Sequence, residues 1–269
     1  MVPHLLREAL HQYERKCLNG ESKMPKILYV NPTGSNPAGT TMTLERRQDI
    51  YGICCDYNIL ILEDDPCCFM NYADTTPPSF LSLDIQGRVI RLDSLSKLIC
   101  PGLRIGWVTA AKPFIEVLDL SVENSYLNSC SLSQVVIYNL LNMWKIEKTL
   151  EYFKSVRDHY RERRDIALRA MNEHLTGLCD WNIPKGGLFL WIKVRDVPDV
   201  HDMIMTRAIR KCISLAPGHG FMASSTKACN FIRVSFGKEP PTQIDRGIML
   251  LADLIRDEKA LLVPPEGST

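Results

Sequence analysis

A lysine lies among hydroxyl and guanidinium side chains in the segment LDSLSKLICPGLRIGW, residues 92–107. Ser94 and Ser96 precede Lys97, and Arg104 follows it seven residues later. A lysine amine attacks an aldehyde only in its unprotonated form, which nearby positive charge or desolvation favours. Hydroxyl groups and a guanidinium are natural donors to a phosphate. The segment therefore predicts a lysine that binds a phosphorylated aldehyde covalently.

Two further polar side chains follow apolar stretches earlier in the chain. Asp64 ends the stretch NILILED, and Asn36 lies in the stretch NPTGSNPAGT. A carboxylate beside a pyridine nitrogen keeps that nitrogen protonated, which makes the ring a better electron sink. Asn-Pro-x-Gly is also a common turn, and each residue alone has an ordinary structural interpretation. The combination of all six indicates a phosphorylated pyridine aldehyde as the cofactor.

These side chains need a scaffold that brings them together. Four apolar stretches predict strands, at residues 25–30, 58–65, 87–94 and 104–110. Thr43 can cap a helix over residues 44–57. The unbroken apolar run of the second stretch predicts a strand covered on both faces. Because ligands of open α/β sheets bind beyond the carboxyl ends of the strands, we expect the polar groups to converge there if the strands are parallel.

The chain divides into two predicted domains. Residues 1–150 alternate strands and helices, as in an α/β layer, after an amphipathic helix that ends at Asn19-Gly20. Residues 151–269 indicate a smaller α+β domain, and the boundary falls near 150–160 in a long helix predicted over 149–175. The other elements expected in the second domain are strands at 181–183 and 188–194, a helix near 200–211, the strands ISLA and NFIRVSF, and a final helix after 240–242. Four strands make a thin sheet for a doubly wound domain.

The composition is that of an ordinary globular protein. The formal net charge of +1 creates no field that would attract nucleic acid. No apolar run is long enough to span a bilayer, and the start of the chain lacks the apolar core of a secretory signal. The ten cysteines include no C-x-x-C pair and the six histidines are scattered, so we expect mostly buried thiols and no metal. We expect a cytoplasmic or mitochondrial protein without a nucleic-acid or membrane partner.

The order and spacing of NPAG, EDDP, DSLSK and GLRIGW resemble those of the fold-type I, pyridoxal-5′-phosphate-dependent aminotransferases of class I/II. LTGL, GGLFLWIKV and FIRVSF also resemble the 2-aminoadipate/kynurenine aminotransferase subgroup, and the likeness runs over residues 26–257. The resemblance implies a large α/β domain with a mixed sheet, incomplete here, and a small C-terminal α+β domain. It also implies a homodimer in the full-length family.

The same resemblance implies roles for individual residues. Lys97 would join the cofactor aldehyde and move a proton, and Asp64 would pair with the pyridine nitrogen. Asn36 would donate to the ring oxygen and line the substrate site. Arg233, in FIRVSF, would hold the substrate α-carboxylate, a task suited to a bidentate guanidinium. The phosphate donors would be Ser94, Ser96 and Arg104.

Two features depart from the family's pattern. Cys67 stands where the family has a tyrosine that donates to the cofactor's ring oxygen, and a thiol is a weaker and shorter donor. We therefore expect slower proton transfer but not necessarily loss of the cofactor. Before residue 25 the sequence shows neither the Gly-Ser-Gln-type phosphate loop nor the ring-stacking aromatic of the family. The expectation is an N-terminally truncated chain whose cofactor site is incomplete.

Together these inferences predict an aminotransferase that moves an amino group from 2-aminoadipate or kynurenine to a 2-oxo acid such as 2-oxoglutarate. The alternative is a truncated form that catalyses poorly and binds the cofactor or a partner subunit. A third possibility is the ligand-sensing domain of a transcription regulator. The neutral charge balance and the lack of a visible helix-turn-helix segment disfavour it.

Overall fold

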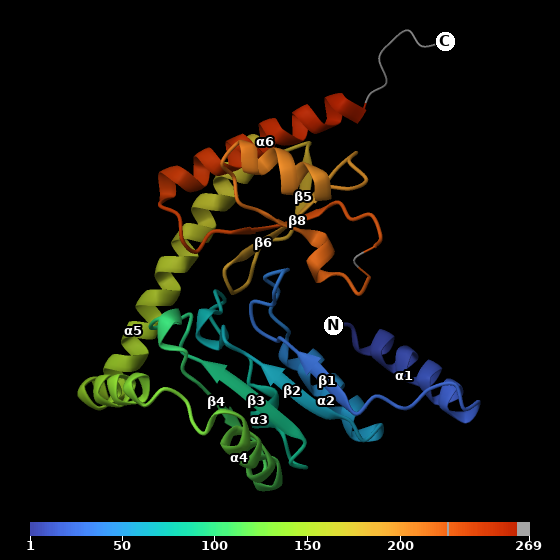
Figure 1. Ribbon diagram of the computed structural model, residues 1–269, viewed down its shortest axis with the longest axis vertical. Coiled ribbons are helices and arrows are strands. Elements are labelled where there is room, and N and C mark those ends of the chain that lie inside the picture. Colours follow the sequence, from blue (N-terminus) through green and yellow to red (C-terminus); the bar gives the residue numbers. More distant parts are fainter. Residues whose placement is uncertain (225, 263–269) are drawn as a thin grey trace. The chain divides into compact units, whose positions relative to one another are not determined.

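The computed structural model describes residues 1–224 and 226–262, which form two compact units (Figure 1). The first unit comprises Met1–Thr33 and Thr41–Ser155. The second joins Gly34–Thr40 to the chain from Val156 onward, so a short early loop belongs to the later unit. The chain passes from one unit to the other within helix α5 (Ser131–His174), which is interrupted at Lys145 by a non-helical residue (φ 57°, ψ −178°).

The first unit contains the four predicted strands in one mixed sheet. They are β1 (Ile27–Val30), β2 (Leu60–Asp64), β3 (Val89–Ser94) and β4 (Gly106–Thr109), in the order β1-β2-β3-β4. The first three run parallel, and β4 runs antiparallel to β3. In this register Asp64 lies opposite Leu92. The carboxyl ends of β2 and β3 therefore lie at the same edge of the sheet.

Two helices of the first unit pack against the central strands of this sheet. The unit contains α1 (Pro3–Leu18), α2 (Leu44–Asp56), α3 (Phe80–Leu83), α4 (Lys112–Tyr126) and the first part of α5, with short 3₁₀ turns η1 (Cys68–Met70) and η2 (Pro101–Leu103). The predicted cap of α2 is confirmed, because the Thr43 side chain accepts a hydrogen bond from the Arg46 amide. α1 packs on α2, and α2 and α3 contact β2. Their apolar core includes Ile50, Ile61 and Phe80, all fully buried.

The expectation that β2 is covered on both faces is wrong. Ile61 and Glu63 are buried, whereas Leu60, Leu62 and Asp64 are only half-buried. Successive side chains of a strand point to opposite faces, and α2 and α3 cover only one of them. The face that bears Asp64 is therefore the more open one.

The second unit is an antiparallel sheet with a helix against it. Its strands are β5 (Cys179–Trp181), β6 (Phe189–Val194), β7 (Ala216–Pro217) and β8 (Phe231–Ser235), in the order β5-β6-β8-β7. The helical elements are the π-helix η3 (Met203–Ala208), the 3₁₀ turn η4 (Gly218–Phe221) and α6 (Pro241–Leu262). The first strand begins two residues earlier than predicted, and ISLA contributes only its last residue to β7. The buried side chains of β6, β8 and α6 form the core.

The cysteines differ from the expectation of mostly buried thiols. All ten are free, but only Cys54, Cys67, Cys179 and Cys229 are buried. Cys100, Cys130 and Cys212 are exposed, and the remaining three are partly buried. Apolar neighbours in sequence did not predict burial because these exposed thiols lie near turns and element ends. Within the described ranges, no helix has the length and apolar character needed to cross a bilayer.

Candidate active site

The turn after β3 presents Lys97 to solvent. Leu95 and Leu98 are both 4% exposed and anchor the turn in the core of the first unit. The Leu98 amide donates to the Leu95 carbonyl oxygen over 3.2 Å, which closes the turn between the two anchors. Lys97, between them, is exposed. The two buried leucines therefore explain how an exposed lysine is held in a fixed turn at the edge of the sheet.

The predicted phosphate donors surround this turn. The Ser96 amide donates to the Ser94 hydroxyl over 3.1 Å, and that hydroxyl faces the Ile105 carbonyl oxygen at 3.5 Å. Arg104 is exposed and adopts a left-handed conformation (φ 53°, ψ 43°) directly before β4. A Cβ on Gly106 would lie 2.7 Å from the Asp93 carbonyl oxygen, so β4 approaches β3 closely only because this residue is glycine.

Asp64 lies at the carboxyl end of β2, held by residues of β1 and the loop after it. The Tyr29 hydroxyl donates to Asp64 Oδ2 over 2.5 Å. The Asn31 side-chain amide donates to the Asp64 backbone carbonyl over 2.6 Å. The carboxylate therefore has a partner of its own and a tethered backbone beneath it.

The charges of both Asp64 and Lys97 act on the thiol of Cys67. The thiol is buried, and burial is the largest cause that raises its pKa, to about 12. The charges of Asp65 and Asp64 also raise this pKa, while the Lys97 ammonium opposes them. These three charged groups therefore lie within electrostatic reach of one thiol, and that thiol is protonated at neutral pH. The structure thus gathers Asp64, Cys67 and Lys97 at the carboxyl edge of the sheet.

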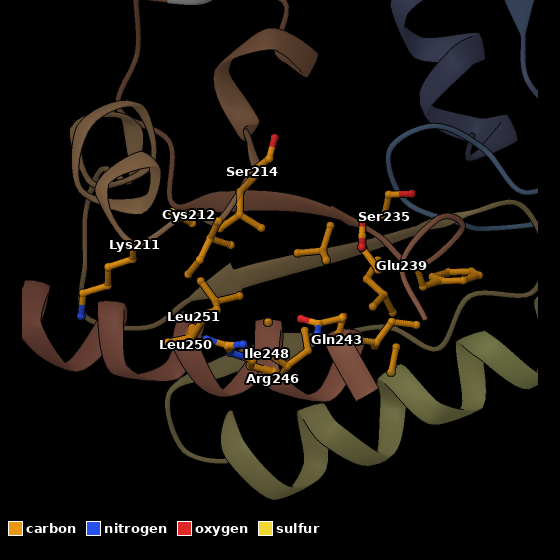
Figure 2. A pocket seen from close by; sticks show the side chains of 18 residues that line it. Lys211, Cys212, Ser214, Ser235, Glu239, Gln243, Arg246, Ile248, Leu250 and Leu251 are labelled. Carbon is orange, nitrogen blue, oxygen red and sulfur yellow. The ribbon is translucent and has the colours of Figure 1, made fainter. Parts of the chain in front are cut away.

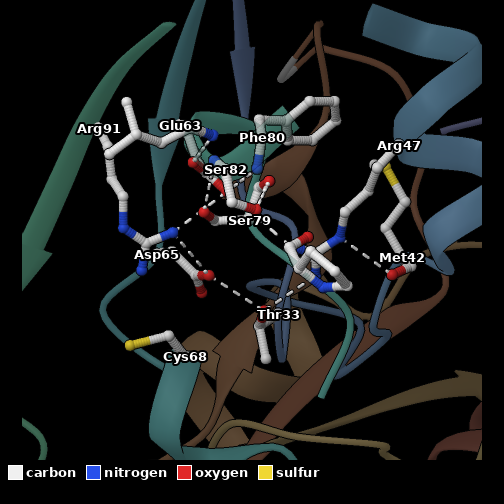
Figure 3. A network of polar contacts seen from close by, with 12 residues as sticks. Thr33, Met42, Arg47, Glu63, Asp65, Cys68, Ser79, Phe80, Ser82 and Arg91 are labelled. Atoms are coloured by element: carbon white, nitrogen blue, oxygen red, sulfur yellow. Dashed lines mark hydrogen bonds and ion pairs between the residues drawn. The ribbon is translucent and has the colours of Figure 1, made fainter. Parts of the chain in front are cut away.

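A buried ionic network flanks Asp64 on the opposite face of β2 (Figure 3). Glu63 and Asp65, on either side of it in sequence, both lie near Arg91: its Nη1 is 3.2 Å from Glu63 Oε1 and 3.5 Å from Asp65 Oδ2. The other end of the Arg91 guanidinium donates to Asp93 over 2.7 Å. Burial chiefly raises the pKa of Asp65 to about 6, against the lowering effect of Arg91.

The network extends from the sheet to α2 and α3. Glu63 accepts hydrogen bonds from the amides of Phe80 and Leu81, at 2.9 and 3.1 Å. Arg47, 1% exposed, donates to the Thr33 hydroxyl over 3.2 Å, and that hydroxyl donates to Asp65 over 3.1 Å. Most polar atoms of these buried charges have partners, which is the condition under which burial is tolerated, but Asp65 Oδ1 has no hydrogen-bond partner among the described residues. They hold the end of β2 against the helices.

In the second unit, two predicted residues meet. Arg233, on β8, donates through Nη1 to Asn36 Oδ1 over 2.9 Å. Its guanidinium carbon lies 4.2 Å from the centre of the Phe189 ring and 4.8 Å from that of Phe221. Burial lowers the pKa of Arg233, but arginine remains charged in proteins. The result is a cation held by one amide and two aromatic rings, which suits a carboxylate ligand.

The loop that carries Asn36 is fixed to the same unit by backbone contacts. Gly34 and Gly187 have positive φ angles, and a Cβ on Gly34 would lie 2.2 Å from the Gly187 nitrogen. The Lys185 amide donates to the Gly39 carbonyl oxygen over 2.8 Å. No side chain fits between these two backbones, so glycine is required at both positions.

A cavity of about 420 Å³ lies between β8 and α6 (Figure 2). Its wall includes Val234, Ile248 and Leu251, and polar side chains such as Glu239 and Gln243 also line it. Because Val234 follows Arg233 on a strand, its side chain points to the opposite face of the sheet. The cavity is therefore separate from the Arg233 site. Nothing in the sequence pattern predicted it.

Several residues around the predicted site were missed from the sequence. They are Tyr29, Thr33, Arg47, Glu63, Arg91 and Phe189. A usable signal existed for Glu63, which follows the inward-facing Ile61 at strand spacing. A charged residue at an inward position requires a buried partner. The partner itself, Arg91, was not identifiable without the register of β3.

Comparisons with known proteins agree with this architecture. Residues 9–249 match the family described as Aminotransferase class I and II. The chain is 39% identical over 258 residues to the mitochondrial kynurenine/alpha-aminoadipate aminotransferase of Bos taurus, and 33% identical to the aminotransferase tdiD of Emericella nidulans. The crystal structure of Pyrococcus horikoshii kynurenine aminotransferase, solved with PMP, KYN as substrates and KYA as products, superposes with a TM-score of 0.86 at 31% identity.

These matches cover nearly all of this chain but not all of the relatives. The alignment to the bovine protein takes in 96% of this chain and 61% of the relative. For tdiD the corresponding shares are 94% and 59%, and for the Pyrococcus structure 95% and 61%. The chain therefore spans about three fifths of the length of the relatives it matches.

Proposed function

The chain belongs to the aminotransferase class I and II family, and from this we propose that it binds pyridoxal 5′-phosphate and transfers an amino group between an amino acid and a 2-oxo acid. The observation that supports this most is the grouping of Lys97, Asp64 and Cys67 at the carboxyl ends of the parallel strands β2 and β3. Ligands of open α/β sheets bind at this edge.

The chemistry of the residues present fits this cofactor. An exposed amine, a carboxylate on the open face of the sheet, two hydroxyls and a guanidinium match an aldehyde, a pyridine nitrogen and a phosphate. When bound, the cofactor supplies an electron sink for the α-carbon of the substrate. We assign Lys97, Asp64, Ser94, Ser96 and Arg104 to hold it.

Each residue then has a specific task. Lys97 binds the aldehyde through Nζ and afterwards carries a proton at that atom, while Leu95 and Leu98 keep the turn in place. Asp64 holds the proton on the ring nitrogen. Cys67 keeps its own proton, so its thiol offers only a weak hydrogen bond to the ring oxygen. Asn36 and Arg233, which contact each other in the second unit, bind the α-carboxylate of the substrate.

For the substrate we propose 2-aminoadipate or kynurenine as amino donor and 2-oxoglutarate as acceptor. Support comes from the names of the mammalian relatives and of the Pyrococcus structure. The name of the mammalian relatives also supports the mitochondrion over the cytoplasm as the compartment to test first. The aromatic rings of Phe189 and Phe221 beside Arg233 are compatible with either amino donor.

The experiment that tests the proposal is covalent capture of the cofactor. The purified chain is incubated with pyridoxal phosphate and reduced with borohydride, which makes the bond between lysine and aldehyde permanent. We expect the label on the peptide that contains Lys97, and its loss in Lys97→Arg. Lys112→Arg is the matched control, because Lys112 has a fully surface-exposed side chain (87%) and reports non-specific labelling. Equal labelling of Lys97 and Lys112 would refute a built site.

A second candidate function is a poorly active form that binds a partner subunit. Cys67 in place of the family's tyrosine favours this candidate, since a buried protonated thiol is a poor donor. A labelled Lys97 without a half-reaction on 2-aminoadipate or kynurenine would support it. If our account of Cys67 is correct, Cys67→Tyr should speed proton transfer in the loaded chain. An unchanged rate would show that the thiol is not the cause.

The partner we propose is a second aminotransferase subunit, as in a homodimer. Large apolar side chains on α4 and the first part of α5 are exposed, among them Leu120, Leu132, Val135 and Met143, at 55–74%. Exposed apolar patches of this kind mark interaction surfaces. Leu132→Glu should lower the mass of the chain in solution from that of a dimer to that of a monomer. Leu262→Glu, at an exposed position of α6, is the control and should not.

A further inference from the structure

Tyr29 and Asp64 lie on the same face of the first unit's sheet. Tyr29 is paired with Leu62 across β1 and β2, and Asp64 is two residues beyond Leu62. Side chains two residues apart on a strand share a face, and an aromatic side chain can span the diagonal to the next residue of that face. The Tyr29 hydroxyl reaches Asp64 Oδ2 at 2.5 Å. The register of β1 and β2 therefore places these two side chains beside each other.

We propose that Tyr29 is a positioning residue for Asp64: its hydroxyl holds one carboxylate oxygen and leaves the other to face the pyridine nitrogen of the cofactor. The inference rests on the proposed function for the identity of that cofactor. A carboxylate has two oxygens and turns freely about its last bond unless one of them is held. A donor on Oδ2 therefore fixes where Oδ1 points.

A second printed contact among the described residues holds the backbone of Asp64. Asn31 donates to the backbone carbonyl of Asp64. Glu63 and Asp65 are locked into the ionic network on the other face of the sheet. Tyr29 restrains the functional end of the Asp64 side chain, and it is itself carried by a strand. A site built on strands keeps its geometry better than one built on loops.

The first test uses the cofactor-free chain. Burial, together with the hydrogen bond and the charge of Asp64, raises the pKa of Tyr29 to about 12. In a chain labelled with ¹³C at tyrosine Cζ, the resonance that disappears in Tyr29→Phe should therefore stay in its protonated position at pH 11. In Asp64→Ala it should shift toward the ionised position at that pH. Titration of Tyr29 as an ordinary tyrosine in the unmodified chain would overturn the proposal.

The second test measures the dissociation constant of pyridoxal phosphate by absorbance. Tyr29→Phe should weaken binding about fivefold, as expected for one hydrogen bond to a charged acceptor at a half-exposed position. Tyr13→Phe, at an exposed position of α1, is the matched control and should bind as the unmodified chain does. In an Asp64→Ala background, Tyr29→Phe should have no further effect, because Tyr29 acts through Asp64.

The outcomes separate the two hypotheses. If the unmodified chain binds the cofactor at Lys97 and Tyr29→Phe matches the Tyr13→Phe control, the positioning role is wrong and the proposed function stands. If Tyr29→Phe weakens binding equally with and without Asp64, Tyr29 has a structural role only and the proposal is also wrong. If the unmodified chain takes up no cofactor, the proposed function fails and the positioning role fails with it.

Discussion

The sheets of the two units bury different chemistry against their helices. On β2, the inward positions are Ile61 and Glu63, and the carboxylate of Glu63 is 0% exposed beside Arg91. On β6, the inward positions are Leu190, Ile192 and Val194, all 0% exposed. The inward positions of both strands are fully buried, yet β2 is held by charge and hydrogen bonds as well as by Ile61, and β6 by apolar packing.

The two cores should therefore tolerate different kinds of substitution. An apolar core depends on volume and shape, so a substitution of similar shape costs little. A buried ionic network depends on every partner, because removal of one charge leaves the others unpaired in a medium of low dielectric constant. The ionic core lies directly beneath Asp64, where the direction of a side chain matters. The apolar core lies beneath the sheet that carries Arg233.

The largest effect is expected from the ionic core. Glu63→Ala should lower the free energy of unfolding by about 4 kcal/mol, because it leaves two amides of α3 without their acceptor and removes one of the carboxylates that balance the buried charge of Arg91. Urea unfolding of the purified chain measures this. Asp56→Ala removes a carboxylate that pairs with Arg7 at the surface and should cost about 0.5 kcal/mol. Equal losses in the two variants would mean that burial adds nothing to the network.

Substitutions in the apolar core should lower the free energy of unfolding by a smaller amount, and that amount should depend on the volume of side chain removed. Ile192→Ala should cost about 3 kcal/mol, and Ile192→Val about 1 kcal/mol, because the cost follows the volume removed. Glu63→Gln keeps the shape of the side chain but loses its charge. In the same urea series it should be clearly more destabilising than Ile192→Val. If Glu63→Gln and Ile192→Val lower the free energy of unfolding equally, the proposed difference between the ionic and the apolar core is wrong.

A pH dependence confined to the first unit should be smaller than the effect of Glu63→Ala or of Ile192→Ala. The pKa of Asp65 is raised from 3.8 to about 6, so between these values the folded chain holds a proton that the unfolded chain releases. This contribution to stability is present at low pH and is lost as the pH rises through about 6. It should reach about 2 kcal/mol, measured as the difference between the unmodified chain and Asp65→Asn in urea unfolding from pH 4 to 7.

The asparagine side chain in Asp65→Asn cannot ionise. The free energy of unfolding of this variant should therefore lack the decline between pH 4 and 7. Ile192→Val is the control from the other core and should follow the pH profile of the unmodified chain. A constant difference between the unmodified chain and Asp65→Asn over the whole range would contradict the shifted titration.

Much of the fold was predictable because local patterns carry it. The apolar stretches before Asp64 and Ser94 predicted two neighbouring strands, and Thr43 predicted the start of α2, because strand periodicity and capping act over a few residues. The exposure of Lys97 also has a local cause, since Leu95 and Leu98 anchor its turn. Family motifs then supplied the roles proposed for these residues.

The partners of those residues were decided only by tertiary structure. Strand spacing shows that Glu63 shares a face with Ile61, but only the register with β3 brings Arg91 to it. Tyr29 reaches Asp64 across 35 positions of sequence, and Arg233 reaches Asn36 across 197. A sequence pattern states which face a side chain occupies, whereas the alignment of strands and the close approach of two backbones decide what it meets there. The sequence by itself therefore determined the elements and the residue types at the edge of the sheet, and the tertiary structure decided how their side chains are held.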